Sequence, residues 1–307
     1  MGSRSQIPEC DLGFLLYHNL MATTSEFKAV CADTVWSDNL YRFLQVIFHL
    51  YPEDAFHHLI SSVSKEQQTD EEIYTTIQKR LPEIKPFLSE LTYALPALKK
   101  QKREITRQVL ELLGNKTTIT GYLEIGSSGR YISELRKKIT VSGNIYLTND
   151  VAPNNSVADI FERGGIAKIG KFIPMNEYRP FSDSNIQTGS IDLILCPIGL
   201  HHCPLERLDD YLQSIHRILR TGGVFIMRDH DVRSPEMATF VSLVHTVFNL
   251  GLNIPWRENK NELRIFRPID EWETMISSIG FAMLPRRILQ DKDPSENTLL
   301  LFKKAGT

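Results

Sequence analysis

Two short runs of the sequence place histidines beside groups that could assist them in catalysis. Residues 228–231 read RDHD and follow the apolar run GGVFIM. Residues 201–203 read HHC and follow the apolar run DLILC after a short loop. Imidazole titrates near neutral pH, so a histidine at the end of a buried strand can take a proton from a substrate. We therefore regard His230, His201 and His202 as candidate catalytic residues.

Two other interpretations of these runs stay open. In the first, RDHD is a structural cap: Asp229 and Asp231 accept hydrogen bonds from loop amides, and Arg228 pairs with a helix carboxylate. In the second, side chains of the two runs together bind a metal ion, since histidine, aspartate and cysteine are common ligands. No spacing in the sequence matches a known zinc motif, so no metal is predicted. Cys203 is expected to be a small buried side chain, and His245 a packing residue within a helix.

From about residue 119 onward, short apolar runs alternate with helical patterns. This alternation predicts a parallel sheet with helices on both faces. The last two apolar runs, GFAMLPRRIL and NTLLLFKKA, predict a hairpin of antiparallel strands at the edge of the sheet. In such a sheet, ligands bind outside the carboxyl ends of the strands. The HHC and RDHD runs should therefore meet at one edge.

The first 118 residues read as helices and show no convincing strand. SDNLYRFLQVIFHL opens with a Ser–Asp start signal, TDEEIYTTIQKRL has acidic groups at its start, and KREITRQVLELLG ends on Gly114. We expect an all-α N-terminal domain over 1–118 and an α/β domain over 119–307. The helical domain could cover the ligand site, form a dimer face or bind a substrate.

A turn of small residues follows the first strand of the α/β half. It reads EIGSSGRY, from Glu124 to Tyr131, and small residues let a backbone pass close to a ligand. Asp150 ends the second apolar run, 24 residues after Gly126. An acid at that distance is typical of a residue that binds ribose hydroxyls in a nucleoside-binding fold.

These stretches together resemble the class I S-adenosylmethionine-dependent methyltransferases. LEIGSSGRY resembles the first motif of that family, and NDVAP resembles the end of its second strand. The run GSIDLILCPIGLHHCPLERLDDYLQSIHRILRTGGVFIMRD resembles its fourth strand, following helix and fifth strand. The resemblance covers about residues 119–303. It implies a Rossmann-like, doubly wound, mostly parallel seven-stranded sheet.

The resemblance also implies roles for particular residues. Glu124 would hold the methionine amino group, directly or through water, and Asp150 would accept both ribose hydroxyls. The expected cofactor-binding residues are Glu124, Gly126, Ser127, Ser128, Gly129, Asp150, Val151, Asn176, Pro197, Ile198 and Leu200. Glu177 is an alternative to Asn176 beside the adenine. The sequence departs from the family pattern where Ser127 and Ser128 occupy the middle of the glycine turn.

The implied activity is methyl transfer from S-adenosyl-L-methionine to an oxygen or nitrogen atom of a small molecule or a protein side chain. The alternative is a protein of the same fold that binds S-adenosylmethionine or S-adenosylhomocysteine without turnover. An NAD-dependent oxidoreductase normally carries G-x-G-x-x-G, which GSSGRY does not supply.

Composition narrows the setting of this activity. The net charge of −2 in 307 residues indicates neither a nucleic-acid nor a membrane partner. The four cysteines, Cys10, Cys31, Cys196 and Cys203, form no CxxC pair and predict reduced thiols. We therefore expect a cytoplasmic protein, with a homodimer as one use of the N-terminal helices.

Overall fold

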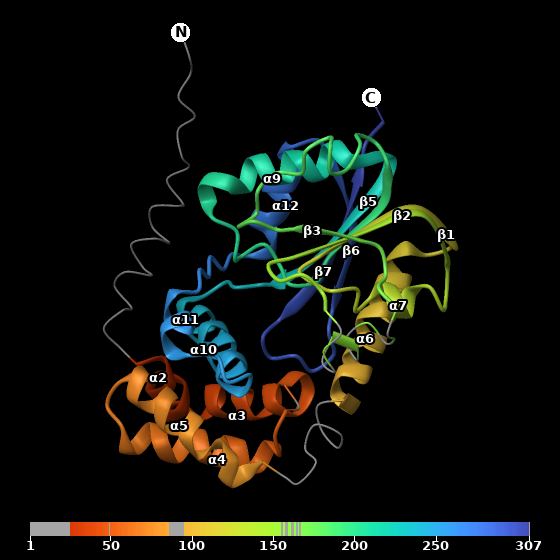
Figure 1. Cartoon of the computed structure of the whole chain (residues 1–307). Coiled ribbons are helices and arrows are strands. Elements are labelled where there is room, and N and C mark those ends of the chain that lie inside the picture. The colour runs from red at the N-terminus through yellow and green to blue at the C-terminus, as the bar shows by residue number, and fades with distance from the viewer. Residues whose placement is uncertain are drawn as a thin grey trace.

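A seven-stranded sheet forms the centre of the molecule, with the strand order β3-β2-β1-β4-β5-β7-β6 (Figure 1). The computed structural model describes residues 25–48, 50–85, 95–154, 156, 159–160, 163, 165 and 167–306. The strands are β1 (Thr118–Ile125), β2 (Thr140–Asn149), β3 (Lys171–Pro174), β4 (Ile191–Cys196), β5 (Leu219–His230), β6 (Phe281–Leu289) and β7 (Asn297–Lys304). The predicted α/β fold class is confirmed.

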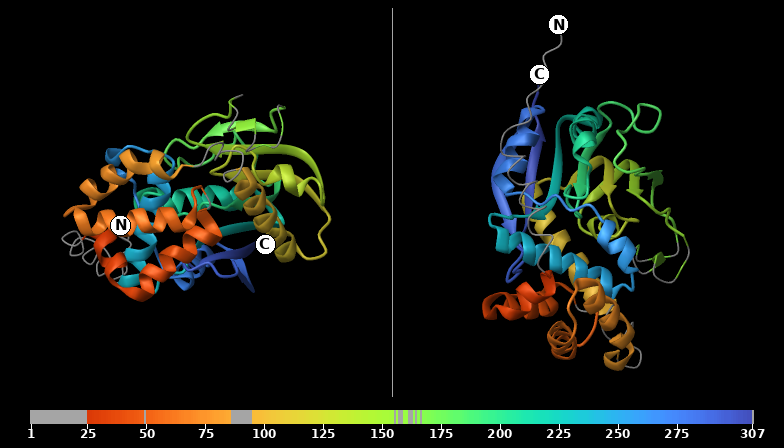
Figure 2. Two further views of the ribbon diagram at one scale, coloured as in Figure 1. Left: turned by 90° about the horizontal axis from the view of Figure 1, so that it is seen from below. Right: turned by 90° about the vertical axis from the view of Figure 1, so that its left-hand side faces the viewer.

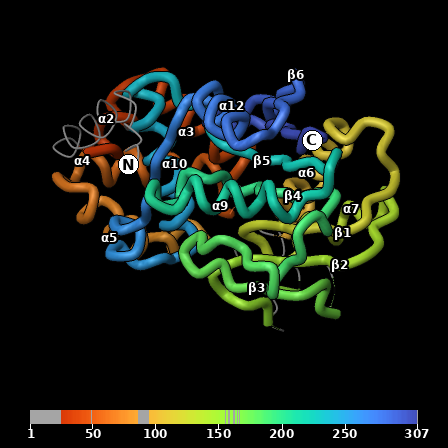
Figure 3. Tube along the Cα trace, turned by 90° about the horizontal axis from the view of Figure 1, so that it is seen from above, coloured from red at the N-terminus to blue at the C-terminus, as the bar shows by residue number. Residues whose placement is uncertain are grey.

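The first five strands are parallel, and the last two form the predicted hairpin. β7 is antiparallel to both of its neighbours and lies between β5 and β6, so β6 is one edge strand of the sheet and β3 is the other. The tube in Figure 3 follows the order across the sheet from β3 at one side to β6 at the other. Because β7 runs against β5, its first residue, Asn297, pairs with His230 at the end of β5.

Helices cover both faces of the sheet, as the continuously apolar strands require. On one face lie α9 (Leu205–Ile218) and α12 (Ile269–Ser278), which share a core with β4, β5 and β7. On the other face lie α6 (Leu95–Leu113) and the single turn α7 (Ile132–Leu135). The fourth strand, IDLILC, is buried at five of its six positions.

The remaining helices form a separate bundle around α10 (Pro235–Gly251). Its members are α2 (Glu26–Ala32), α3 (Thr34–Phe43), the π-helical segment η2 (Leu44–Phe48), α4 (Glu53–Glu66) and α5 (Asp70–Ile84). Figures 1 and 2 show this bundle beyond α10 and the short α11 (Trp256–Asn261). Because α10 follows β5 directly, the bundle lies at the carboxyl-terminal edge of the sheet.

The helix starts follow local capping chemistry. Thr69 and Glu72 form a reciprocal capping box at the start of α5, and the Ser234 side chain accepts from the Met237 amide at the start of α10. The predicted start of α3 at Ser37 is wrong: Asp33 caps the helix by accepting from the Val35 and Trp36 amides. An aspartate free to bond two amides at once is the better cap.

The structure also bears on the expected domain boundary, on the cysteines and on membrane-spanning helices. α6 precedes residue 118 yet packs on the sheet, while α2 to α5 pack on α10; the domain boundary at 118 stays a prediction. Cys31, Cys196 and Cys203 are free thiols, and Cys10 lies outside the described residues. Within the described ranges, no helix combines the length and apolarity needed to cross a bilayer.

Candidate active site

His201 and Asp229 form a buried pair at the carboxyl edge of the sheet. Nδ1 of His201 lies 2.7 Å from Oδ1 of Asp229, and the two residues are only 2% and 1% exposed. His201 lies in the loop after β4, and Asp229 is the second-last residue of the neighbouring strand β5. The expectation that the two runs meet at one edge is therefore confirmed.

Gly199 allows the pair to form. Its φ of +77° is unfavourable for residues with a side chain. A Cβ atom on Gly199 would lie 2.6 Å from Nδ1 of His201 and 2.7 Å from Oδ2 of Asp229. The loop can thus pass close to β5 only because this residue is glycine.

Asp229 accepts two further hydrogen bonds from the backbone. Oδ2 accepts from the Leu200 amide at 2.9 Å, and Oδ1 accepts from the amide of His230 at 2.8 Å. Burial alone would raise the pKa of Asp229, but its interactions with His201, His230 and the Leu200 amide together lower that pKa below its ordinary value. Asp229 is therefore an anion that receives N–H groups.

His230 ends β5 and points toward α10, where it meets His245. Its Nδ1 donates to the carbonyl of Ser295 at 2.6 Å, and its Nε2 lies 3.3 Å from Nε2 of His245. Burial, and then the nearby His201, lower the pKa of His230 to about 4. Burial also lowers the pKa of His245 well below its usual range. Both rings are therefore neutral at pH 7.

His202 is the most accessible of the four histidines. Its Nδ1 donates to the carbonyl of Leu263 at 2.8 Å, and its side chain is 21% exposed. Burial, followed by the proximity of His201, lowers its pKa to about 4. His202 is therefore a neutral ring at the rim of the group.

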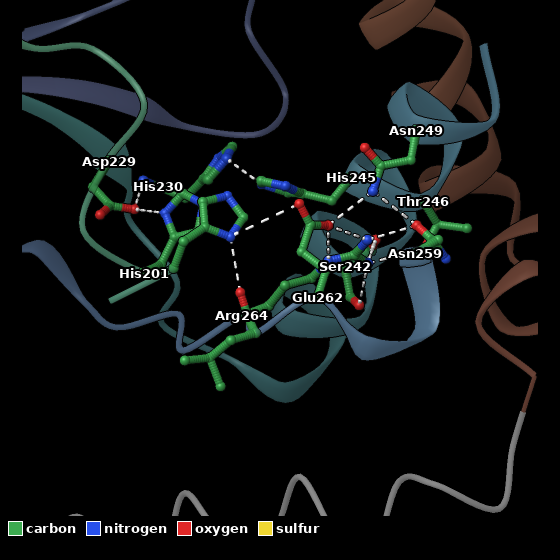
Figure 4. Close-up of polar contacts among 12 residues, drawn as sticks. His201, Asp229, His230, Ser242, His245, Thr246, Asn249, Asn259, Glu262 and Arg264 are labelled. Atoms are coloured by element: carbon green, nitrogen blue, oxygen red, sulfur yellow. Dashed lines mark hydrogen bonds and ion pairs between the residues drawn. The ribbon is translucent and has the colours of Figure 1, made fainter. Parts of the chain in front are cut away.

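The four imidazoles make one cluster drawn from three elements: the loop after β4, the end of β5, and α10. Ring centroids of His201 lie 4.2 Å from those of His202, 4.9 Å from His245 and 5.6 Å from His230. Figure 4 shows His201, His230 and His245 turned toward one another. Phe266 closes the group with its ring centroid 5.1 Å from that of His201.

A polar network behind the cluster fixes the segment that carries Leu263. Arg264 donates to Glu262, to Asn259 and to the carbonyl of Ser242 on α10 (Figure 4). Ser242 in turn donates to Oε1 of Glu26 on α2 at 2.7 Å. The helical bundle is thus linked by hydrogen bonds to the wall of the histidine cluster.

The remaining residues of RDHD have structural partners. Oδ1 of Asp231 accepts from the Ile269 amide at the start of α12. Arg228 donates to Gln290 and lies 3.6 Å from Asp293, both in the loop before β7. The cap interpretation fits these two residues, although the partner of Arg228 is a loop and not a helix.

His245 is the site residue that the sequence analysis missed. It was expected to be a packing residue, yet it contacts all three of the predicted histidines. One signal pointed to it: the helix after β5, PEMATFVSLVHTVFNLG, is apolar except for a few residues. A histidine midway along such a helix needs a polar partner.

The small-residue turn after β1 has the expected backbone shape. Gly126 has φ +75°, and a Cβ there would lie 2.2 Å from Cδ1 of Ile198. The side chain of Ser127 accepts from the Arg130 amide at 3.0 Å, and Ser127 and Ser128 are buried. The two serines are therefore part of the packed turn, and the hydrogen bond to Ser127 stabilises it.

Glu124 is placed under this turn and is 0% exposed. Its carboxylate accepts from the amides of Tyr131 and Ile132 and from the hydroxyl of Tyr122. Because protein groups already bind both oxygens, Glu124 shapes the turn. Its expected contact with a methionine amino group, directly or through water, stays a prediction.

Asp150 and Val151 are exposed at the end of β2, beside this turn. The backbone amide of Asp150 is held by the Asn149 side chain at 3.0 Å. Pro197 and Leu200 are buried in the loop after β4, and Gly129 is buried in the turn. These residues share one edge with Gly126 and Ile198, as expected.

Asn176 and Glu177 lie after β3, with Tyr178, in a left-handed backbone turn. The side chain of Arg207 donates to the carbonyl of Glu177 at 2.7 Å and lies 3.0 Å from its carboxylate. Asn176 is exposed and has no such side-chain partner among the described residues. Asn176 therefore remains the freer of the two candidates.

Comparison with known proteins agrees with this architecture. Residues 123–227, from the end of β1 to the middle of β5, match the family model described as "Methyltransferase domain". A comparison with curated proteins gave no match.

Solved structures of similar fold include several methyltransferases. The 1,6-didemethyltoxoflavin-N1-methyltransferase of Burkholderia thailandensis, with S-adenosylhomocysteine bound, is 14% identical over 67% of this chain and 78% of its own, with a TM-score of 0.45. The N-methyltransferase NodS of Bradyrhizobium japonicum WM9 is 16% identical over 66% and 87%, with a TM-score of 0.44. The CurJ carbon methyltransferase is 16% identical over 95% and 71%, with a TM-score of 0.46. At these identities and TM-scores the likeness identifies neither the activity nor the substrate of this chain.

Proposed function

We propose that this chain transfers a methyl group from S-adenosylmethionine to a small-molecule acceptor, because residues 123–227 match the methyltransferase-domain model and the sheet has the strand order described above. One observation carries the proposal: a single loop serves both halves of the site. Ile198 covers Gly126 in the turn after β1, and His201, three residues later, enters the histidine cluster. A donor held at the turn and an acceptor held at the histidines would therefore be neighbours.

The turn fits a nucleoside ligand. The Ile198 side chain lies where a Cβ atom on Gly126 would be, so the glycine lets the loop after β4 pass close to the turn. Asp150 offers an exposed carboxylate at the neighbouring strand end. A carboxylate there can accept hydrogen bonds from two ribose hydroxyls, a charge-assisted pair. Gly126, Ser128, Asp150, Val151, Asn176, Pro197, Ile198 and Leu200 are the residues we assign to this subsite.

When bound, S-adenosylmethionine supplies an electrophilic methyl group, so the protein chiefly has to align the acceptor and remove its proton. Asp229 holds Nδ1 of His201, which leaves the Nε2 lone pair free. Nε2 is buried and has no hydrogen-bond partner among the described residues. We assign the proton-accepting lone pair to Nε2 of His201, with the rings of His202 and His230 beside it. The acceptor would be a hydroxyl, an amine or an acidic carbon.

Calorimetric titration tests the donor half. We expect the wild-type protein to bind S-adenosylmethionine and S-adenosylhomocysteine but not NAD. Asp150→Ala should weaken binding at least about 10-fold, the loss of a charge-assisted hydrogen-bond pair. Asp210→Ala, which removes an exposed aspartate on α9, is the matched control and should bind normally.

Transfer of labelled methyl groups to pools of small molecules tests the acceptor half. Labelled product that disappears in His201→Ala would support the proposal. Tight cofactor binding with no product from any pool would instead favour the non-catalytic binding protein. If the wild-type protein binds neither S-adenosylmethionine nor S-adenosylhomocysteine, the proposal is overturned.

A further inference from the structure

We infer that His201, His202 and His245 form a binding site for a divalent transition-metal ion such as Zn²⁺ or Co²⁺. One ring nitrogen of each lies within 4.8 Å of those of the other two. The inference rests on the proposed function for its role, because the site lies where the acceptor would bind. The binding of a metal ion itself can be tested without any acceptor.

Hydrogen bonding fixes which nitrogen of each ring is bare. A neutral imidazole carries one N–H, and a group that only accepts must receive it. His201 gives its Nδ1 hydrogen to Asp229, His202 gives its own to the carbonyl of Leu263, and His230 gives its own to the carbonyl of Ser295. In all three rings Nε2 is therefore a bare lone pair.

The contact between His230 and His245 completes this assignment. Nε2 of His230 is bare, so Nε2 of His245, 3.3 Å away, must donate to it. Nδ1 of His245 is then bare. His201, His202 and His245 each keep a free lone pair, and they are the three residues whose ring nitrogens lie together.

Such a set of lone pairs needs a positive partner. Nε2 of His201 is buried without any hydrogen-bond partner in the described part of the chain, which is costly unless something binds it. A metal ion satisfies all three nitrogens at once.

The surroundings of the rings match those of known metal ligands. Histidines that bind metals usually donate their other N–H to a carboxylate or a backbone carbonyl, which fixes the ring orientation. Asp229 does this for His201, and Leu263 does it for His202. Asp229 and Glu262 also bring negative charge near the rings, which offsets the charge of a dication.

The spacing requires a modest contraction. Nitrogen ligands about 2.0–2.1 Å from a tetrahedral zinc ion lie roughly 3.3–3.4 Å apart. Small rotations of His202 and His245, the less buried members, would have to bring the three nitrogens closer than the present limit of 4.8 Å. Three protein ligands leave a fourth position open, as in catalytic zinc sites. The acceptor would occupy that position, and the lone pair of His201 would then bind the cation instead of a proton.

Cobalt binding to metal-free protein provides the first test. After dialysis against a chelator, we expect wild-type protein to take up one equivalent of Co²⁺ with the visible absorption of a tetrahedral site. His202→Ala and His245→Ala should each raise the Kd at least about 10-fold, the loss of one of three ligands. His58→Ala, which removes an exposed histidine on α4, is the matched control. Circular dichroism would verify that each variant is folded.

Asp229→Asn tests the supporting contact. Loss of the carboxylate behind a ligand histidine typically costs about 10- to 100-fold in metal affinity. X-ray absorption of the zinc-loaded wild type should show nitrogen neighbours at about 2.0–2.1 Å. Cobalt binding of wild type that is no tighter than that of the His202→Ala/His245→Ala double variant would overturn the inference.

A pair of variants separates this inference from the proposed function. His202→Ala should weaken cobalt binding at least about 10-fold and leave S-adenosylhomocysteine binding unchanged, whereas Asp150→Ala should do the reverse. If cobalt binds normally but no nucleoside ligand does, the metal site stands and the methyltransferase proposal falls. The reverse result removes the metal and leaves His201 as a base.

Discussion

Asp229 accepts three N–H groups on two carboxylate oxygens, and one of the donors, His201, lies 28 residues away in the sequence. The other donors are the amides of Leu200 and His230. A single buried side chain therefore fixes the loop after β4, the end of β5 and a ring of the cluster.

Asp229→Asn should destabilise the protein. Asparagine has one accepting oxygen instead of two, so at least one buried N–H loses its partner, at a cost of about 1–3 kcal/mol. Urea unfolding at pH 7 would measure the loss. Asp231→Asn is a useful comparison because Oδ1 of Asp231 accepts from the Ile269 amide and Oδ2 from the half-exposed Arg233. An effect as large there would contradict a special place for Asp229.

Gly199→Ala should cost more stability than its backbone conformation alone explains. Any alanine at positive φ costs about 1–2 kcal/mol. At Gly199 the new Cβ would also collide with both members of the His201–Asp229 pair. Gly189→Ala is the matched control, since Gly189 has φ +62° and no atom would lie within 4 Å of its Cβ. If urea unfolding gave the same loss in free energy of unfolding for the two variants, the loop after β4 would have moved to relieve the collision, and the prediction would be wrong.

The stability of the metal-free protein should fall as the pH is lowered from about 6.5 toward 4. In the unfolded chain, histidines gain protons near pH 6.5, but in the folded protein the pKa of His230 is about 4. The unfolded state therefore binds more protons in this window, and unfolding is favoured on acidification. His230 alone would contribute up to about 3 kcal/mol, since each pKa unit is worth about 1.4 kcal/mol.

Urea unfolding at pH 7, 6, 5 and 4, with a chelator present, measures this effect. His202, whose pKa is also about 4, adds to the fall in the same window. Asp229 adds a further loss at lower pH, because its lowered pKa stabilises the fold until the carboxylate is protonated. A free energy of unfolding that stays constant from pH 7 to pH 4.5 would argue against buried neutral histidines.

Glu26→Gln should stabilise the protein at pH 7 and have little effect at pH 4. Burial, the largest influence, raises the pKa of Glu26, although the Ser242 hydroxyl and Arg264 oppose it. The folded state thus favours the protonated acid, and this stability is lost as the pH rises through the folded pKa. Glutamine removes the charge but can still accept from Ser242. Glu66→Gln, at an exposed position, is the control, and matching pH profiles for the two variants would contradict the prediction.

The sequence predicted the sheet well because its strands carry strong local signals. IDLILC and GGVFIM are continuously apolar, as central strands must be, and helical runs separate them. The carboxyl ends of parallel strands share an edge, so the meeting of His201 with Asp229 followed from topology alone. The place of β7 between β5 and β6 did not follow, because a hairpin can join a sheet by either of its strands.

The site could be predicted only as far as those strands reach. His245 lies on α10, and its orientation depends on how that helix packs between the sheet and the bundle. The sequence analysis recognised no partner for the N-terminal helices, so nothing indicated which face of α10 they would cover. For Glu124 the sequence predicted the position but not the partners. The hydrogen bonds that its carboxylate accepts from the amides of Tyr131 and Ile132 depend on how the turn folds.

α10 belongs to two structures at once. One side of it carries His245 into the cluster, and the rest is packed among the N-terminal helices, with Phe240 against Trp36 and Gly251 against Phe48. A shift of α10 would therefore move one histidine while the other three stay with the sheet and its loops. The position of the helical bundle therefore sets the distance between His245 and the other three rings. A ligand or partner that displaced the bundle would change that distance.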